Sequence, residues 1–454
     1  MQLRSIKLKN IGLFEDQEIP IAPTLKNHSN ITIFIGSNGA GKTSILKAIA
    51  TSLSWFISRL RTEKGVGNSI LEEEILNKAN AGLIEVKVEI DESQVQHQDH
   101  SQDEGFQWTL AKLRRGRNSS FASNLTACTR LAEIYRNFLT DDEAASLPLI
   151  AFYPVERIVL DIPLKIKTKH TFFQLDAYDN SLNQGVDFRR FFEWFRERED
   201  AENESTISED FFSQPPLFDL EPDFWEKLKQ LNASAKDRQL MAVRTAISQF
   251  MPHMKNLRVR RKPRLHMTID KYGETLNVAQ LSQGEKSLMA LVGDIARRLA
   301  MLNPALDNPL TGKGIVLIDE VDLHLHPSWQ RTICKHLVAT FPNCQFVLTT
   351  HSSLVISDYK DVLLYALSDG EVQELPPQYG QDVNTVLLEI MGTSIRNQTI
   401  DERLGDLLDA IQDVDLDLAR SLLVQLSQEL PENNIELIKA KLLLRKQEIR
   451  HASH

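Results

Sequence analysis

The stretch ITIFIGSNGAGKT, residues 31 to 43, decides the fold that we expect for this chain. It begins with an apolar, β-branched run of the kind that is buried on both faces of a parallel or mixed sheet. The segment GSNGAGKT, which starts at Gly36, then matches G-x-x-x-x-G-K-[ST] at every fixed position. A helix is expected from Lys42 onwards. This order of strand, loop and helix predicts a P-loop.

The residues of this loop have separate expected roles. Glycines let the backbone wrap around a phosphate, and the amides and dipole of the following helix favour an anion. Lys42 is predicted to reach the β- and γ-phosphates of ATP, and Thr43 to ligate Mg²⁺. The bland alternative, a glycine-rich turn with a chance Lys-Thr pair, is disfavoured by the flanking strand and helix. The complete predicted ATP-binding set is Gly36, Ser37, Asn38, Gly39, Ala40, Gly41, Lys42, Thr43 and Ser44.

Two further apolar strands are predicted to end in chemically useful residues. GIVLIDE, residues 314 to 320, places Asp319 to hold Mg²⁺ and Glu320 to orient or deprotonate the attacking water. CQFVLTTHS, residues 344 to 352, ends near His351, which could hydrogen-bond a γ-phosphate or that water. Taken alone, each could be an ordinary buried strand with solvated residues at its end. The P-loop in the same chain favours the nucleotide interpretation.

A helix start at LSQGEK, residues 281 to 286, carries an unexpected glycine. Ser282 is a good N-cap, and Glu285 three positions later completes a Ser-x-x-Glu capping box. Gly284 lies in the first turn, where a glycine brings no advantage to the helix itself. A glycine at this position therefore needs a reason beyond the helix itself.

The composition fits a cytoplasmic protein with reduced cysteines. The 454 residues carry a net charge of -10, 42% are hydrophobic, and there are three cysteines without metal-ligand spacing. The first ten residues read as a strand instead of a signal peptide, and no run is long enough to cross a bilayer. The net charge argues against a generally basic surface that coats DNA, although a local basic patch remains open.

Other motifs have weaker functional interpretations. His324 and His326 lie near Asp319 and Asp322, a pattern that could bind Zn²⁺. Pro327, directly after His326, predicts a loop that enters a helix, so we disfavour a separate Zn²⁺ site. The basic clusters at 112–117 and 258–264 could contact nucleic-acid phosphates or could be the solvent face of edge strands. For the first cluster we favour the edge strand, and for the second the two interpretations stand level.

The order P-loop, LSQGEK, acidic strand and strand with histidine resembles the ABC-type ATPase head of the RecF and SMC proteins. This resemblance implies an α/β P-loop NTPase fold with a mixed sheet, and ATP-driven dimerisation. It also implies that the signature motif contacts the ATP held by the other protomer, through Ser282, Gly284 and Glu285, together with Asp322 of the D-loop region. His351 corresponds to the switch histidine. No glutamine marks the usual Gln-loop, for which 152–157 is the expected region.

Two longer stretches resemble a narrower family. Residues 177–204 and 379–392, with the helical tail after them, look like the ATPases of Septu antiphage systems (PtuA) and related ATPases that accompany retrons. That resemblance implies a bacterial defence ATPase that forms a homodimer or higher homo-oligomer. It also implies an HNH nuclease partner (PtuB-like) and action on DNA through the complex, with no membrane involved.

Two alternatives to this function remain. A RecF-like DNA-repair ATPase would bind DNA by itself, and a transporter ATPase is disfavoured by the Leu-Ser-Gln-Gly-Glu signature. Only about a hundred residues follow His351 and they are mainly helical, so we expect no nuclease domain there. The expected organisation is an ATPase head at 1–375 and helical insertions, with a core at 1–60 and 270–375 and an inserted lid at 61–269. A helical region at 376–454 is expected to follow, for partner or oligomer contact through its acidic stretch (Asp401 to Asp417) and leucine-rich helices. A helical pair that packs on the sheet is the alternative, and the two interpretations stand level.

Overall fold

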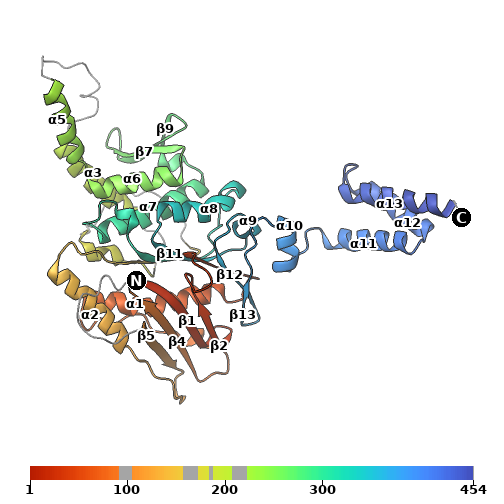
Figure 1. The fold of residues 1–454 in the computed structure, drawn as a ribbon, viewed down its shortest axis with the longest axis horizontal. Coiled ribbons are helices and arrows are strands. Elements are labelled where there is room, and N and C mark those ends of the chain that lie inside the picture. Colours follow the sequence, from red (N-terminus) through yellow and green to blue (C-terminus); the bar gives the residue numbers. More distant parts are fainter. Residues whose placement is uncertain (91–104, 157–171, 184–187, 207–221, 453–454) are drawn as a thin grey trace. The chain divides into compact units, whose positions relative to one another are not determined.

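The strand of the P-loop, β3 (Ile31–Gly36), lies inside a six-stranded sheet, of which Figure 1 labels β11, β12 and β13. The order is β13-β12-β3-β11-β10-β6, and all neighbours are parallel except the pair at the β13 edge. The predicted apolar strands are buried throughout, as expected for a sheet covered on both faces. The other five strands are β6 (Leu149–Tyr153), β10 (Gly314–Ile318), β11 (Cys344–Thr349), β12 (Leu363–Ser368) and β13 (Glu371–Leu375).

This computed structural model describes residues 1–90, 105–156, 172–183, 188–206 and 222–452. The chain divides into two units, Met1–Gln381 and Asp382–His454. The mixed sheet and the P-loop lie in the first unit, and the second is built from helices. No helix in the described ranges is long and apolar enough to cross a membrane.

A four-stranded antiparallel sheet covers the helix that follows the P-loop. Its order is β2-β1-β4-β5, as expected for the predicted strands at the N-terminus and at 81–115. Helix α1 (Lys42–Arg61) contacts β4 of this sheet and strands β3, β6, β10 and β11 of the mixed sheet. The P-loop helix is therefore held between two sheets. The added elements are β1 (Gln2–Ile11), β2 (Phe14–Pro20), β4 (Ala81–Glu89), β5 (Phe106–Leu113) and α2 (Thr126–Asp141).

A third, small sheet precedes the signature helix. The segment 257–269, which reads as one strand in the sequence, forms β7 (Met254–Arg260) and β8 (His266–Lys271), paired antiparallel. The turn between them contains Pro263, which has no amide hydrogen to continue a ladder. Strand β9 (Glu274–Asn277) completes the sheet, and α3 (Phe188–Ser205), α5 (Pro222–Ser234) and α6 (Arg238–Phe250) precede it.

The signature helix α7 (Gln283–Leu302) is buried along most of its length and carries an internal ion cluster. Asp294 accepts hydrogen bonds from Arg297 at 2.6 Å and Arg298 at 2.7 Å, and all three residues are fully buried. Tyr153 at the end of β6 donates its hydroxyl to the same carboxylate at 3.0 Å. Burial alone would raise the pKa of Asp294, but the two guanidinium groups lower it to about 2. The cluster ties the signature helix to the mixed sheet.

The remaining helices of the first unit follow strands of the mixed sheet. Helix α8 (Pro327–Thr340) connects β10 to β11, and the short α9 (Ser353–Ser357) follows β11. Single 3₁₀ turns lie at Glu72–Glu74, Gln174–Tyr178, Val278–Gln280 and Pro309–Thr311.

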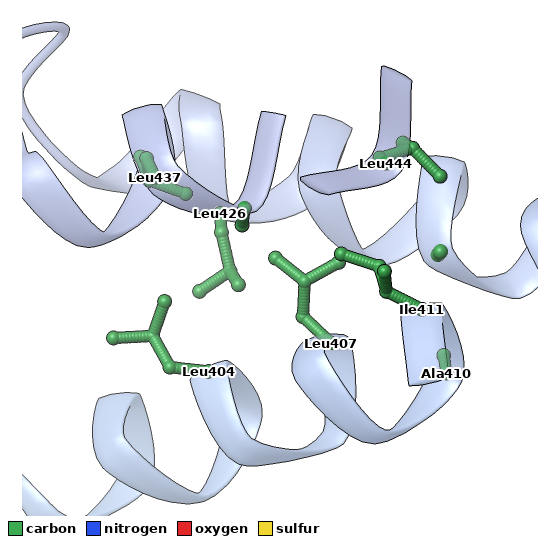
Figure 2. Packing of buried hydrophobic residues seen from close by; sticks show 9 residues of the cluster. Leu404, Leu407, Ala410, Ile411, Leu426, Leu437 and Leu444 are labelled. Carbon is green, nitrogen blue, oxygen red and sulfur yellow. The ribbon is translucent and has the colours of Figure 1, made fainter. Parts of the chain in front are cut away.

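The second unit has a hydrophobic core of its own. After the single turns at Val383–Thr385 (α10) and Val386–Ile390, three helices pack together: α11 (Gln398–Gln412), α12 (Leu416–Glu429) and α13 (Ile435–Ala452). Figure 2 shows side chains from these helices meeting in the core. The core residues are Leu404, Leu407, Ala410, Ile411, Ala419, Leu426, Leu437, Ala440 and Leu444.

The buried ion cluster yields a stability prediction. Asp294→Ala leaves two buried guanidinium groups without their carboxylate, which should lower the free energy of unfolding by about 3–5 kcal/mol. Because the folded pKa is depressed, the stabilisation by Asp294 is complete above the ordinary carboxyl pKa of 3.8 and is lost as the pH falls towards 2. Urea denaturation at pH 7 measures the loss. Asp417→Ala, which removes an exposed partner of Arg420, is the control and should change stability by less than about 1 kcal/mol.

Candidate functional site

The P-loop occupies the turn between β3 and α1, and its glycines are required by backbone geometry. Gly39 and Gly41 have φ values of 82° and 97°, in the left-handed region. A Cβ on Gly41 would lie 2.7 Å from the Phe14 ring, and one on Gly36 would lie 2.5 Å from the Leu367 carbonyl oxygen. Steric contact therefore favours glycine at Gly36 and Gly41, and the positive φ favours it at Gly39, in agreement with the sequence motif.

Lys42 is buried and lies among acids. Its Nζ donates hydrogen bonds to the carbonyl oxygens of Gly36 at 2.8 Å and Ser37 at 2.9 Å. Burial lowers the pKa of Lys42, while the negative charges of Asp319, Glu320 and Asp322 act in the opposite direction. The fold thus brings the P-loop lysine and the acids after β10 into one electrostatic site, although almost 280 residues separate them in sequence.

Both carboxylate oxygens of Asp319 accept hydrogen bonds from threonine hydroxyls. Thr43 Oγ1 donates to Oδ2 at 2.7 Å, and Thr349 Oγ1 donates to Oδ1 at 2.6 Å. Asp319 is almost fully buried. A hydroxyl beside a carboxylate is a set of hard oxygen ligands that fits Mg²⁺, which commonly takes one or two protein oxygens and completes its shell with water and phosphate. Thr43 and Asp319 are the two residues that the sequence predicts as Mg²⁺ ligands.

Glu320 begins a tight turn after β10. Its φ is 46°, a left-handed conformation that is uncommon for a residue other than glycine. Its amide donates to Thr349 Oγ1 at 2.7 Å, and the next amide, of Val321, donates to the Thr349 carbonyl oxygen at 2.9 Å. Strain of this kind concentrates at functional sites and persists where surrounding contacts enforce it. Here Thr349 supplies those contacts.

Asp322 and His351 meet within one chain. Asp322 Oδ1 accepts hydrogen bonds from Thr350 Oγ1 and from the backbone amide of His351, the latter at 3.4 Å. The His351 side chain is exposed. Successive threonines at the end of β11 therefore serve different partners, because alternate side chains point to opposite faces. Thr349 holds the Asp319 carboxylate, and Thr350 holds Asp322.

The signature turn has the predicted capping box. Ser282 Oγ accepts from the Glu285 amide at 3.3 Å, and the Glu285 carboxylate accepts from the Ser282 amide at 3.1 Å. Lys271 of β8 forms an ion pair with Glu285 at 2.8 Å. Burial would raise the pKa of Glu285, but hydrogen bonds from Lys271 and Ser282 outweigh it and lower the pKa.

Gly284 also contacts the turn that follows β10. A Cβ at this position would lie 2.5 Å from the carbonyl oxygen of His324. Close packing inside a single chain is thus sufficient reason for the glycine, in addition to the phosphate contact inferred from its sequence position. Within the described residues, no hydrogen bond or ion pair joins the turn 282–285 to the P-loop of the same chain.

The two histidines before α8 contribute to local structure. His326 caps α8 by accepting a hydrogen bond from the Ser328 amide, and His324 is exposed in a left-handed turn. Among the residues that the structure places, no group of three His, Cys, Asp or Glu side chains could hold a metal ion.

The two basic clusters differ in their surroundings. In the first, Arg114 donates to the carbonyl oxygen of Ile75 at 2.9 Å. In the second, Arg261 pairs with Asp200, while Arg258 and Arg260 are exposed on β7. In the region expected for the Gln-loop, Tyr153 contacts Asp294, and 157 lies outside the described residues.

Together, the P-loop, the acids after β10 and the capped signature helix on a mixed sheet define the head of a P-loop ATPase. Comparison with known families agrees, because residues 31–357 match the family described as "AAA domain, putative AbiEii toxin, Type IV TA system". The chain belongs to this family of ATPases.

Two retron proteins are similar over most of the chain. The Retron Vc95 probable ATPase of Vibrio cholerae serotype O1 biovar El Tor is 34% identical, over 78% of this chain and 71% of its own length. The Retron Ec83 probable ATPase of Escherichia coli is 32% identical, over 86% and 76% respectively. These matches confirm the resemblance to retron ATPases and the prediction of an ATPase.

Two further similarities are more local or more distant. The Septu protein PtuA of Bacillus mycoides (strain KBAB4) is 37% identical over 24% of this chain and 15% of its own length. Among solved structures, an SMC head bound to the C-winged helix domain of ScpA has a TM-score of 0.45 and 15% identity. That match covers 83% of this chain and 98% of the SMC chain.

Thr349 is a positioning residue that the sequence motifs do not single out, and it yields a prediction. Thr349→Val keeps the shape of the side chain but removes the donor to Asp319 and the acceptor from Glu320. We expect kcat for ATP hydrolysis to fall about 10- to 100-fold, with a similar increase in the Mg²⁺ concentration for half-maximal activity. Thr349→Ser, which retains the hydroxyl, should restore most of both. Equal losses in the two variants would contradict a role for the hydroxyl.

Proposed function

We propose that this chain is the ATP-binding and ATP-hydrolysing subunit of a bacterial antiphage defence complex, and that it controls a separate HNH nuclease that cuts DNA. One observation carries the proposal of ATP hydrolysis: Thr43 and Thr349 donate hydrogen bonds to the Asp319 carboxylate, which lies near the buried Lys42. The retron and Septu relatives support the defence setting. The three free, buried cysteines are compatible with the proposed cytoplasmic location.

In the proposed mechanism, the backbone amides of residues 36–44 and Lys42 bind the phosphates of ATP. Thr43 and Asp319 hold Mg²⁺, which supplies charge neutralisation at the β- and γ-phosphates when bound. Glu320 orients or deprotonates the attacking water, and its strained turn fixes its starting position. His351 donates a hydrogen bond to the γ-phosphate or to the water, with its backbone held by Asp322.

The proposed active form is a head-to-tail dimer around ATP. The exposed Ser282 and the amides of the α7 N-terminus form an anion-binding end that faces solvent in a single chain. In the dimer, Ser282, Gly284, Glu285 and Asp322 contact the ATP bound by the partner. ATP thereby becomes part of the interface, and its hydrolysis releases the two heads.

Two substitutions separate binding from hydrolysis. Lys42→Ala should abolish ATP binding, because the backbone cradle then loses its only side-chain cation within the motif. Glu320→Gln should retain binding, lower kcat by about 10²- to 10⁴-fold and trap the ATP-dependent dimer. Equilibrium binding of labelled ATP, phosphate release and light scattering measure the three quantities. If Glu320→Gln hydrolyses ATP at the wild-type rate, Glu320 is not the base.

A RecF-like ATPase that binds DNA by itself is the second candidate function. Arg258 and Arg260 favour it, because they are exposed at alternate positions of β7 and make no ion pair within the described residues. Such a surface would bind phosphates with an affinity that falls steeply as salt increases.

Co-expression with a neighbouring HNH protein, where the genome encodes one, tests the choice between the two functions. The defence proposal predicts a complex on size exclusion, with DNA cleavage that requires the HNH subunit and changes in Lys42→Ala. Absence of a complex would remove the nuclease part of the proposal. Filter binding of DNA to the ATPase alone is the parallel measurement. Tight, ATP-dependent binding without the partner would support the RecF-like alternative.

A further inference from the structure

The signature turn carries a negative charge at the end that we propose to contact ATP. Glu285 is the third residue of α7, so it lies in the helix turn whose amides form the anion-binding end. Burial would raise its pKa, but hydrogen bonds from Lys271 and Ser282 lower it, so the carboxylate is ionised at neutral pH. A carboxylate repels a triphosphate. The proposed ATP contact therefore requires a positive charge beside Glu285.

The two carboxylate oxygens of Glu285 have different partners. Oε2 accepts hydrogen bonds from the Ser282 amide at 3.1 Å and from the Ser282 hydroxyl at 3.0 Å. Oε1 lies 2.8 Å from Nζ of Lys271. In the single chain, the Ser282 hydroxyl therefore donates to the carboxylate and not to a ligand. Lys271 pairs with the oxygen that the capping box does not use.

Lys271 reaches the signature turn from a separate element. It is the last residue of β8, directly before the turn to β9. The side chains of Lys271 and Glu285 are 24% and 15% exposed, so solvent screens their attraction less than it screens that of a fully exposed pair. Among the residues that the structure describes, Lys271 is the cation that forms an ion pair with Glu285.

We propose that Lys271 is a positioning residue for ATP-driven closure, and that its charge neutralises Glu285 so that the signature turn can accept the γ-phosphate of ATP held by a second copy. This role rests on the proposed head-to-tail dimer. As the phosphate arrives, the Ser282 hydroxyl turns from the carboxylate to the phosphate, and Lys271 remains paired with the carboxylate. Without the lysine, the phosphate would meet an unpaired negative charge.

An ion pair that only holds β8 against α7 is the alternative. Other contacts, however, already hold both elements. The capping box fixes Glu285 through Ser282, and Gly284 packs closely against the His324 carbonyl. Strand β8 is paired with β7 on one side and with β9 on the other. Because position is secured without the ion pair, the charge of Lys271 is the property that needs a function.

ATP-dependent dimerisation of the full chain tests the role of this charge. The parent for all variants carries Glu320→Gln, which we expect to trap the dimer, and light scattering at several protein concentrations gives the dissociation constant of the dimer. Lys271→Gln should raise this constant about tenfold or more, because the phosphate then meets an unpaired carboxylate. Labelled ATP should still bind at the P-loop of the single chain, which shows that the variant is folded.

Two further variants separate the charge of Lys271 from other effects of the substitution. Lys271→Arg keeps a positive charge and should restore most of the dimerisation. Lys255→Gln is the matched control, because this exposed lysine lies on the neighbouring strand β7 and makes no ion pair within the described residues. It removes the same charge from the same sheet and should change the dissociation constant by less than about twofold.

Removal of the opposing charge distinguishes an electrostatic role from a structural one. Glu285→Gln retains the capping box, in which glutamine serves as glutamate does. In the Glu285→Gln background, Lys271→Gln should change the dissociation constant by less than about threefold, because no carboxylate is left to neutralise. The two substitutions form a double-mutant cycle, and the expected coupling is nearly as large as the effect of Lys271→Gln alone.

Four outcomes would overturn the role of Lys271 while the ATP-driven dimer of the parent still stands. Lys271→Gln could dimerise as tightly as the parent, Lys271→Arg could be as weak as Lys271→Gln, or Lys255→Gln could weaken dimerisation equally. Lys271→Gln could also be just as harmful in the Glu285→Gln background. A Glu320→Gln parent that stays monomeric with ATP would instead contradict the proposed closure itself, and the role of Lys271 with it.

Discussion

The hydrogen bonds of Asp319 are the interaction on which the ATPase site depends. A buried carboxylate is costly unless its oxygens are paired, and here each oxygen accepts from a threonine hydroxyl. One threonine belongs to the P-loop helix and the other to the neighbouring strand β11. The parallel pairing of β3, β11 and β10 is what places their carboxyl ends side by side. The chemistry of the site therefore depends on the order of the strands, because a different order would separate Asp319 from Thr43 and Thr349.

A second constraint acts on helix α7, whose N-terminus we propose to contact the ATP bound by a partner. Its buried ion cluster joins it to β6, and its first turn is fixed by the capping box and by Lys271. An anion-binding helix end is useful only if its amides keep their direction. The charges inside the helix are therefore important for orientation as well as for stability.

Local patterns were sufficient to predict the P-loop, the acidic strand end and the capped helix, because each depends on residues adjacent in sequence. Strands β12 and β13 were not predicted, although β12 pairs with β3 and completes the site's sheet. The break between β7 and β8 was also missed, because alternating basic and apolar residues continue across the turn. The roles of Thr349 and Thr350 depend on strand pairing, which no single stretch reveals. The only signal in the sequence was the position of Thr349 and Thr350, two polar residues at the end of an apolar strand.

The contact between Gly284 and the His324 carbonyl has a consequence for how such heads can be altered. The signature turn and the turn after β10 touch without a side chain between them, so neither can shift without the other. The second turn also contains Asp322, which holds the segment of His351. In an engineered chimera, the two turns should be exchanged as one block. A signature helix grafted alone would meet a backbone shaped for a different partner, even if every catalytic residue were retained.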